Sequence, residues 1–223
     1  MNADGKIRVA VSGAAGKMGQ AVVGAVLAAD DMALTGKADP ALGTSLEEVL
    51  EDADVVVDFT RPDTALANAR TIIASGTHCV IGTTGVDYAE LEGAGSGKLF
   101  FAPNFAIGAV MLMDVAQRIA PFMPECEIIE LHHPAKLDAP SGTARRTREL
   151  IEAAGGNVHE PIHSVRLPGV IASQEVVFGE LGQTLSVRHE TYSRESFMPG
   201  VLLAIRRVGE LPDQITVGLE KLF

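Results

Sequence analysis

The sequence predicts a two-domain α/β protein, in which a parallel sheet with crossover helices is joined to a smaller α+β domain. Strand and helix patterns alternate through the first hundred residues, which is typical of a parallel sheet. The alternation stops after about residue 105, and two β-rich runs separated by E-L-G-Q then predict an antiparallel pair. A helix and a strand pattern return near the end. We therefore assign residues 1–104 and 193–223 to the first domain and 105–192 to the second.

Short apolar runs predict five strands in the first domain, at residues 7–11, 32–35, 55–59, 78–81 and 99–102. The third run, V-V-V-D-F, has no polar alternation and should be buried on both faces. Apolar residues at helical spacing predict a helix over residues 17–29. A second helix should follow the third strand, with Thr60 as its cap, Pro62 in its first turn and Gly76 at its end.

The second domain is predicted to contain helices at residues 108–123 and 144–153 and strands at 126–131, 174–179 and 184–189. A last helix over 199–209 and a last strand over 214–217 have the βα character of the first domain. These two elements are why the first domain is expected to include the end of the chain.

Composition narrows the function classes. The formal net charge of −11 argues against sequence-independent nucleic-acid binding, which needs Lys and Arg to displace counterions from phosphates. The two cysteines, Cys79 and Cys126, each lie in an apolar run, which predicts buried thiols in a reducing compartment. The apolar stretches are too short to span a bilayer, and the N-terminus lacks a signal-peptide pattern. A cytoplasmic protein without membrane contact is expected.

The turn G-A-A-G-K-M-G lies between the first strand and the first helix. Its glycines, Gly13, Gly16 and Gly19, lie where a Rossmann-like domain seats a dinucleotide pyrophosphate on a helix N-terminus. Asp39 follows about twenty residues on, where a carboxylate can bind the ribose hydroxyls. Asp39 favours NAD by repelling a 2′-phosphate, whereas Lys17 and Lys37 could attract one. Dinucleotide binding is predicted, and the choice between NAD and NADP stays open.

Two further turns, G-T-T-G at residues 82–85 and A-P-N-F at residues 102–105, follow the fourth and fifth strands directly. In an open parallel sheet the carboxyl ends of the strands line the ligand crevice, so both turns could contact a nicotinamide ribose and amide. The alternative is that they are ordinary turns rich in Gly, Thr and Asn.

The stretch E-L-H-H-P-A-K-L-D-A-P-S-G-T-A, at residues 130–144, concentrates polar groups between a predicted strand and a predicted helix. If Glu130 and His132 share one strand face, His133 points to the other, so the two imidazoles do not converge and no metal site is predicted. Lys136 lies in the loop beyond them, and its ammonium group could pair with an anionic substrate or donate a proton.

Ser141 is expected to cap the helix that follows this loop. The backbone N–H groups of Gly142 and Thr143 would then form an anion site with the helix dipole behind it. Imidazole, ammonium and helix N-terminus together predict a pocket for a small carboxylate that also needs protonation. The competing interpretation is a capped helix after a hydrogen-bonded polar loop.

These motifs together resemble the dihydrodipicolinate reductase family. The stretch at residues 130–144 resembles the family signature, and further landmarks occur in the expected order: G-A-A-G-K-M-G, D-F-T-R-P, G-T-T-G, A-P-N-F-A-I-G and S-F-M-P-G-V-L-L-A-I-R. The resemblance implies a Rossmann domain, a substrate domain whose mixed sheet builds a homotetramer, and reduction of a small dicarboxylate substrate, 4-hydroxy-tetrahydrodipicolinate, by NADH or NADPH.

The resemblance also implies roles for individual residues. His132 would be the proton donor or acceptor and Lys136 the proton donor, while His133, Gly142 and Thr143 would hold the substrate carboxylates. Cofactor contacts are expected from Gly13, Ala14, Ala15, Gly16, Lys17, Met18, Asp39, Gly82, Thr83, Thr84, Ala102, Pro103, Asn104 and Phe105. Pro40 stands where some members carry an Arg suited to NADPH, so NADH can also serve, and the preference between the two cofactors stays open.

Two other functions compete with this interpretation. A different two-domain amino-acid dehydrogenase would share the glycine turn but would have no reason for H-H-x-x-K followed by S-G-T. A non-catalytic nucleotide sensor would need neither His132 nor Lys136.

Overall fold

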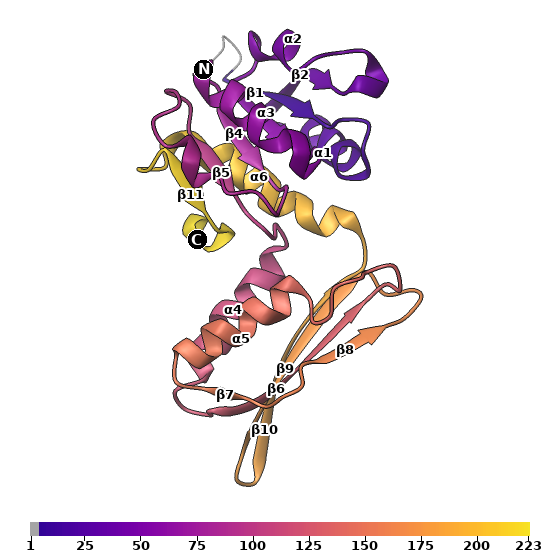
Figure 1. Ribbon diagram of the computed structural model, residues 1–223, viewed down its shortest axis with the longest axis vertical. Coiled ribbons are helices and arrows are strands. Elements are labelled where there is room, and N and C mark those ends of the chain that lie inside the picture. Colours follow the sequence, from indigo (N-terminus) through magenta and orange to yellow (C-terminus); the bar gives the residue numbers. More distant parts are fainter. Residues whose placement is uncertain (1–4) are drawn as a thin grey trace. The chain divides into compact units, whose positions relative to one another are not determined.

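The computed structural model describes residues 5–223 and divides the chain into two compact units (Figure 1). Unit 1 comprises the chain up to Phe105 together with Phe197–Phe223, and unit 2 comprises Ala106–Ser196. The sequence predicts the corresponding limits at 104 and 192. Each unit has its own sheet and its own core.

Unit 1 is built on a parallel sheet. Within the described residues it has six strands in the order β11-β5-β4-β3-β1-β2. Its elements are β1 (Ile7–Ser12), α1 (Lys17–Ala28), β2 (Met32–Ala38), α2 (Glu47–Leu50), β3 (Val55–Asp58), α3 (Pro62–Ala74), β4 (His78–Ile81), β5 (Leu99–Phe101), α6 (Met198–Arg207) and β11 (Ile215–Val217). The five predicted strands up to residue 102 are present, and β11 pairs with β5, so the chain returns to this sheet as predicted.

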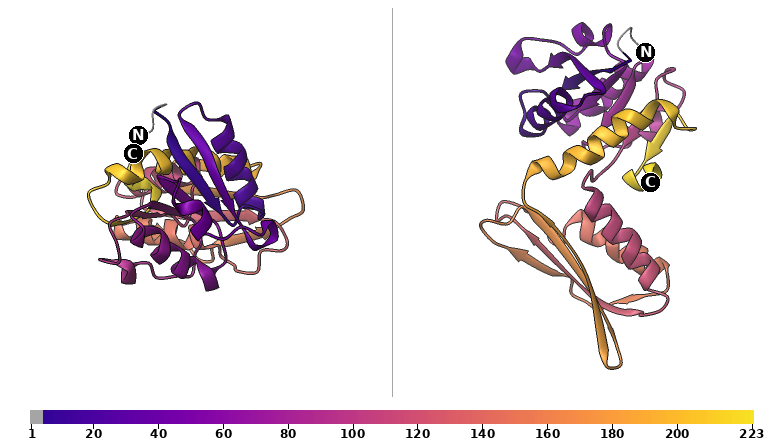
Figure 2. Two further views of the ribbon diagram at one scale, coloured as in Figure 1. Left: turned by 90° about the horizontal axis from the view of Figure 1, so that it is seen from above. Right: turned by 180° about the vertical axis from the view of Figure 1, so that it is seen from behind.

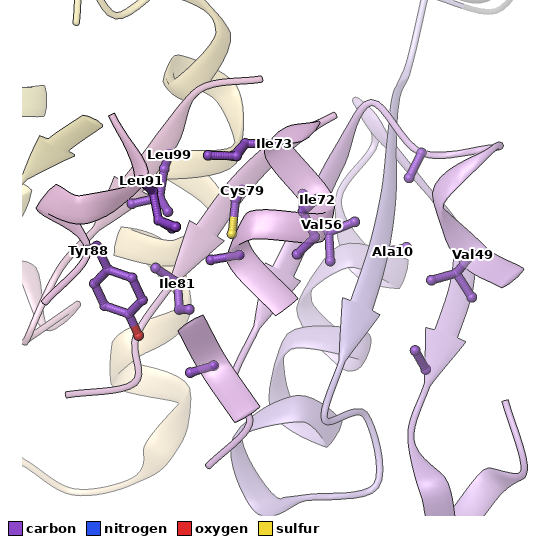
Figure 3. Packing of buried hydrophobic residues seen from close by; sticks show 14 residues of the cluster. Ala10, Val49, Val56, Ile72, Ile73, Cys79, Ile81, Tyr88, Leu91 and Leu99 are labelled. Carbon is purple, nitrogen blue, oxygen red and sulfur yellow. The ribbon is translucent and has the colours of Figure 1, made fainter. Parts of the chain in front are cut away.

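Most strands of this sheet are apolar and lack polar alternation, which is the pattern expected when other elements pack over a sheet. All four residues of β3 are buried, which confirms the prediction from V-V-V-D-F. One face of the sheet packs against α3, whose Ile72 and Ile73 lie close to Val56 and Cys79 in Figure 3. Both cysteines of the chain are buried free thiols, as predicted.

The helix after β3 begins one residue later than the cap prediction implies. Arg61 occupies the N-cap position of α3 without a side-chain hydrogen bond, and Pro62 is the first helical residue. Thr60 is not the cap, because its hydroxyl and its backbone N–H both donate to the carboxylate of Asp58 instead. Gly76 does follow the end of the helix, with φ of 89°, in the left-handed region that glycine tolerates.

Unit 2 consists of two helices on one face of a mixed sheet (Figure 2). Its elements are α4 (Ile107–Ile119), β6 (Glu125–His132), α5 (Gly142–Ala153), β7 (Asn157–Val158), β8 (His163–Arg166), β9 (Ala172–Glu180) and β10 (Gln183–Thr191). The strand order among the described residues is β10-β9-β6-β7, and β8 also pairs with β6. The antiparallel pairing of β9 with β10 confirms the prediction.

The alternation of burial along β6 shows which face the helices cover. Cys126, Ile128 and Glu130 are buried, whereas Glu125 and Glu127 are exposed. The strands β7 and β8 were not predicted from the sequence, since N-V and H-S-V-R are too short and too polar to stand out. The parallel pairing of β8 with β6 brings Arg166 level with His132. This register places a cation next to the end of β6.

Candidate active site

The glycine turn of unit 1 packs closely against its neighbours at the end of β1. Gly13 has φ of 75°, and a Cβ atom built there would lie 2.9 Å from the carbonyl oxygen of Phe59. A Cβ atom at Gly19 would lie 2.1 Å from the carbonyl oxygen of Gly13, so α1 packs directly on the turn. Only glycine allows these approaches, which bring the N-terminus of α1 to the carboxyl edge of the sheet.

The backbone amides of this turn are not all available to a phosphate. The N–H groups of Gly13 and Ala14 donate to the carbonyl of Ala38, and that of Ala15 donates to the carboxylate of Asp39 at 3.0 Å. Lys17 and Met18 open α1, and amides in the first turn of a helix have no acceptor inside the helix. These two amides are therefore the donors best placed for a pyrophosphate.

Asp39 lies in a pocket of about 440 Å³ at the same edge of the sheet. One carboxylate oxygen accepts from Ala15 and the other accepts from Ala41 at 2.9 Å, which fixes the orientation of the group. Glu47 also lines the pocket, whereas neither Lys17 nor Lys37 does. Among the described lining residues there is no cation to receive a 2′-phosphate.

A polar stripe on one side of this pocket was not predicted. Thr60, Thr64 and Asn68 all line it. The spacing of four places Thr64 and Asn68 on one side of α3, and Thr60 lies just before the helix. Behind them, the fully buried Asp58 accepts from Asn68 at 2.9 Å and from Thr60. The i, i+4, i+8 repeat of short polar residues was the sequence signal that could have revealed this stripe.

The turns after β4 and β5 lie near the same edge. A Cβ atom at Gly82 would lie 2.2 Å from the ring of Phe59, and the hydroxyl of Thr83 donates to the carbonyl of Thr60 at 2.8 Å. Ala102 and Phe105 are buried, at 0% and 3% exposure, and Phe105 packs edge-on against Phe59. Contacts from Ala102 to a cofactor would therefore use its backbone.

In unit 2 the carboxylate of Glu130 directly contacts the Nδ1 atom of His132 at the end of β6. Glu130 and His132 therefore lie on the same face of the strand, as the sequence analysis assumed. Glu130 is completely buried, and Arg166 donates to both of its oxygens, at 2.8 and 3.0 Å. The side chain of His132 keeps 14% of its surface exposed. A charged carboxylate thus lies behind an imidazole that still reaches solvent.

The electrostatics of this cluster keep Glu130 ionised. Burial acts to raise the pKa of Glu130, but hydrogen bonds from Arg166, Ser164 and His132 outweigh it and hold the pKa below its ordinary value. Burial lowers the pKa of His132, and the charges of Lys136 and Arg166 act in the same direction against the hydrogen bond to Glu130. At neutral pH the free protein therefore holds a carboxylate beside a neutral imidazole.

Lys136 lies in the loop between β6 and α5. Its ammonium group pairs with Asp138 at 2.8 Å, and its side chain as a whole is 24% exposed. Its backbone N–H donates to the carbonyl of His133. His133 follows the last residue of β6 and is exposed. The loop is therefore ordered by its own turn and by an ion pair that a stronger anion could displace.

Ser141 caps α5 as predicted. Its hydroxyl accepts from the backbone N–H of Ala144 at 3.1 Å, and its backbone is extended, as an N-cap requires. Gly142 and Thr143 are the first two residues of the helix, so their amides lie at its positive end. The loop from His132 to Ser141 thus starts at a fixed strand end and finishes at a fixed helix start.

Among residues 5–223 there is no group of His, Cys, Asp and Glu side chains arranged to hold a metal ion. The same part of the chain contains no helix of a length and hydrophobicity that would cross a bilayer.

Family models match both parts of the chain. The model described as dihydrodipicolinate reductase, N-terminus, matches residues 7–105, and the model described as dihydrodipicolinate reductase, C-terminus, matches residues 108–223. This chain belongs to the dihydrodipicolinate reductase family. Membership confirms the resemblance found in the motifs and the Rossmann-like class of unit 1. It also confirms that the protein is an NAD(P)H-dependent oxidoreductase.

Curated relatives in this family match along their whole length. The 4-hydroxy-tetrahydrodipicolinate reductase of Thermobifida fusca (strain YX) is 48% identical over 245 aligned positions, which cover 97% of this chain and 98% of the relative. The enzyme of the same name from Nocardia farcinica is 45% identical over 244 positions, covering 96% and 97%. A solved structure, a dipicolinate-bound dihydrodipicolinate reductase from Paenisporosarcina sp. TG-14, superposes with a TM-score of 0.83 at 34% identity and covers 98% of this chain and 100% of that one.

Proposed function

We propose that this chain reduces 4-hydroxy-tetrahydrodipicolinate to tetrahydrodipicolinate with NADH or NADPH, in the diaminopimelate route to lysine, and that His132 and Lys136 handle the proton. The names of the relatives supply the substrate class, and a dicarboxylate, dipicolinate, is bound in the related structure. The observation that carries the assignment of residues is the loop between β6 and α5. It presents an imidazole, an ammonium group and a helix N-terminus from two rigid elements.

The residues of unit 1 fit a dinucleotide. Gly13 and Gly19 allow the turn to pack closely against Phe59 and α1, the N-terminus of α1 supplies amides for the pyrophosphate, and Asp39 lines a pocket with room for the ribose. When bound, the nicotinamide supplies a hydride. The turns after β4 and β5 would hold its amide and ribose, as proposed for Thr83, Thr84 and Asn104.

Substrate binding is assigned to unit 2. The N-terminus of α5, with Gly142 and Thr143, and the side chain of His133 would hold the two carboxylates, because a helix N-terminus stabilises negative charge. The charge of Lys136 would attract the dianion, in competition with its partner Asp138. These contacts orient the substrate before any proton moves.

Protonation follows from the charge that the reduction creates. Loss of the 4-hydroxyl group of the substrate as water leaves a conjugated imine. Hydride addition to this imine builds negative charge near the hydride acceptor, and a positioned acid there contributes roughly 10²–10⁴-fold in rate. Lys136 would donate this proton. Burial lowers the pKa of His132 in the free protein, but two substrate carboxylates would raise it. His132 would then exchange a proton through its Nε2 atom.

A coupled assay tests the function directly. The substrate is generated from pyruvate and aspartate semialdehyde by the preceding enzyme, and the loss of reduced-nicotinamide absorbance is followed with NADH and with NADPH. We expect absorbance to fall in the presence of this protein. No loss with either cofactor would refute the proposal.

Lys136→Ala tests the assignment of the proton donor. We expect kcat to fall by about 10²-fold or more, because the positioned acid is lost, while the affinity for NADH measured by fluorescence titration stays unchanged. Arg146→Ala removes an exposed cation from α5 and serves as the control. If Lys136→Ala lowered the affinity for NADH by as large a factor as it lowered kcat, the assignment of Lys136 as the proton donor would be contradicted.

We also infer a homotetramer and a cytoplasmic location. The face of the unit 2 sheet turned away from α4 and α5 contains the half-buried Ile129, Leu131 and Val177, and no helix of unit 2 covers it. This face is a candidate for subunit contacts. The two reduced, buried cysteines support a reducing compartment.

A further inference from the structure

A buried ion pair lies behind the proposed proton-handling residues. Glu130 has no exposed surface, and its two oxygens accept from the two terminal nitrogens of Arg166. One of these oxygens also meets the Nδ1 atom of His132. Burying a carboxylate and a guanidinium is unfavourable unless their hydrogen bonds are satisfied. Apolar side chains would stabilise the sheet at these positions at least as well, so stability alone does not explain the pair.

Arg166 connects the strand to the loop as well. Its guanidinium donates to the backbone carbonyl of Asp138 at 2.7 Å and approaches that of Lys136 at 3.4 Å. The same group that holds Glu130 therefore also holds the segment from which the Lys136 side chain projects. Arg166 therefore contacts the loop of Lys136 directly and reaches His132 through Glu130.

We propose that Glu130 and Arg166 are positioning residues, which together set the imidazole tautomer of His132 and the place of the Lys136 loop. The proposal rests on the proposed function of His132 and Lys136. It assigns no contact between this pair and the substrate.

The tautomer follows from the chemistry of the contact. An ionised carboxylate only accepts hydrogen bonds, so the Nδ1 atom of His132 must carry the proton that lies between them. The lone pair is then on Nε2, and any proton that His132 takes up or releases moves at that atom. When Nε2 binds a proton, the carboxylate of Glu130 stabilises the resulting imidazolium. Lys136, Arg166 and burial oppose this charge.

Glu130→Gln tests this role because it keeps the shape and removes the charge. Arg166 donates to both carboxylate oxygens, so the single nitrogen of the Gln amide faces the guanidinium in either orientation. When it takes the place of Oε2, it also faces Nδ1 of His132. A donor facing Nδ1 favours the opposite tautomer. We expect kcat to fall at least about tenfold with the KM for NADH unchanged, as for a carboxylate that orients a catalytic imidazole. We also expect the loss of activity with rising pH to occur at lower pH, because the imidazolium is less stable.

Two further measurements separate positioning from simple folding damage. The nitrogen spectrum of ¹⁵N-histidine-labelled protein, with His132 assigned from a His132→Gln variant, should show the Nδ1–H form in the parent chain and a shift toward Nε2–H in Glu130→Gln. If Glu130→Gln does not fold, Glu130→Gln combined with Arg166→Met removes the unpaired buried cation. This double variant should fold and lose at least as much kcat, because it also removes the contacts of Arg166 to the carbonyls of Asp138 and Lys136.

Glu149→Gln is the matched control, because Glu149 pairs with Arg146 on α5 and both side chains are 59% exposed. It should leave kcat and the pH profile unchanged. Arg166→Lys keeps the charge but cannot reach Glu130 and the loop carbonyls together, so it should raise the KM for substrate and lower kcat.

The proposal is wrong if Glu130→Gln, or the double variant, folds and retains the parent kcat, pH profile and tautomer. This failure is distinct from failure of the proposed function. An inactive parent chain that still shows the Glu130-dependent tautomer would overturn the function and retain the positioning role. If the parent chain is fully active but the tautomer of His132 does not change in Glu130→Gln, the proposed function stands and the positioning role is wrong.

Discussion

At the level of single residues, His132 shows how its surroundings set the direction of proton transfer. Burial lowers the pKa of this imidazole, and Lys136 and Arg166 add to the effect. The contact with Glu130 works in the opposite direction and leaves Nε2 as the exchanging atom. Binding of a dianion would weaken the influence of both cations. The proton affinity of His132 should therefore depend on whether substrate is present.

This dependence predicts a difference between two pH profiles. If protonated His132 is required, activity falls as pH rises through the pKa of the imidazole. The profile of kcat/KM reports the free protein, so its apparent pKa should lie below the ordinary histidine value of about 6.5, whereas the profile of kcat should fall at higher pH. Steady-state rates between pH 5 and 9 measure both. Identical apparent pKa values in the two profiles would argue against the effect of substrate charge.

The pocket around Asp39 predicts a preference for NADH, because its described lining contains two carboxylates and no cation. Glu47→Lys should raise kcat/KM for NADPH by about two- to fivefold, since an exposed ion pair contributes about 0.2–1 kcal/mol. The ratio of kcat/KM for the two cofactors measures this effect. Glu51→Lys, which changes the net charge equally but does not line this pocket, should leave the ratio unchanged.

Residues whose role depends on local pattern could be predicted from the sequence. Ser141 is recognisable as a cap because it precedes a helix pattern, and the shared face of Glu130 and His132 follows from strand alternation. Arg166 could not be predicted, because it reaches the site only through the register of β8 with β6. A polar four-residue strand gives no signal of which partner it will pair with.

At the level of elements, α1 contains one glycine that close packing requires and another glycine that packing does not require. The Cβ of Gly19→Ala would overlap the carbonyl of Gly13, so we expect a loss of about 1–3 kcal/mol in unfolding free energy and weaker NADH binding. Nothing lies within 4 Å of a Cβ at Gly24, so Gly24→Ala should stabilise by about 0.5–1 kcal/mol. Urea unfolding and NADH titration measure these effects. A Gly19→Ala chain as stable as the parent would contradict the proposed packing.

Element prediction succeeded where apolar residues repeat and failed where hydrogen bonding decides. The run V-V-V-D indicated β3, which is fully buried, and the two β-rich runs indicated β9, whose burial alternates, and β10, which is mostly exposed. The cap of α3 was wrong because Asp58 competes for the hydroxyl of Thr60. The short helix α2 was missed because four residues are too few to show a period.

At the level of the whole molecule, the uncovered sheet face predicts how the proposed tetramer can be broken. Val177→Glu places a second carboxylate opposite Glu127 and close to Ile129 on that face, and an unpaired charge enclosed in a subunit contact is strongly unfavourable. We expect a smaller assembly in light scattering coupled to size-exclusion chromatography. Leu27→Glu, at a position 67% exposed on α1, is the control. A Val177→Glu tetramer would locate the subunit contacts elsewhere.

The two-unit organisation could be predicted because each unit has its own period of secondary structure. Strand–helix alternation predicts the parallel sheet of unit 1, and its loss predicts a different sheet in unit 2. The strand order within unit 2 could not be predicted, since β6 is paired on one side by β9 and on the other by β7 and β8. Pairing between distant segments has no local signature.

The pairing of β11 with β5 also determines the order in which the molecule can be completed during synthesis. Unit 2 is continuous and ends at Ser196, whereas unit 1 needs Phe197–Phe223 to cover the edge of β5. A nascent chain that has reached Ser196 therefore contains a finished unit 2 and an unfinished unit 1. Open sheet edges template aggregation, so β11, which is translated after unit 2, protects a sheet whose other strands are made before unit 2.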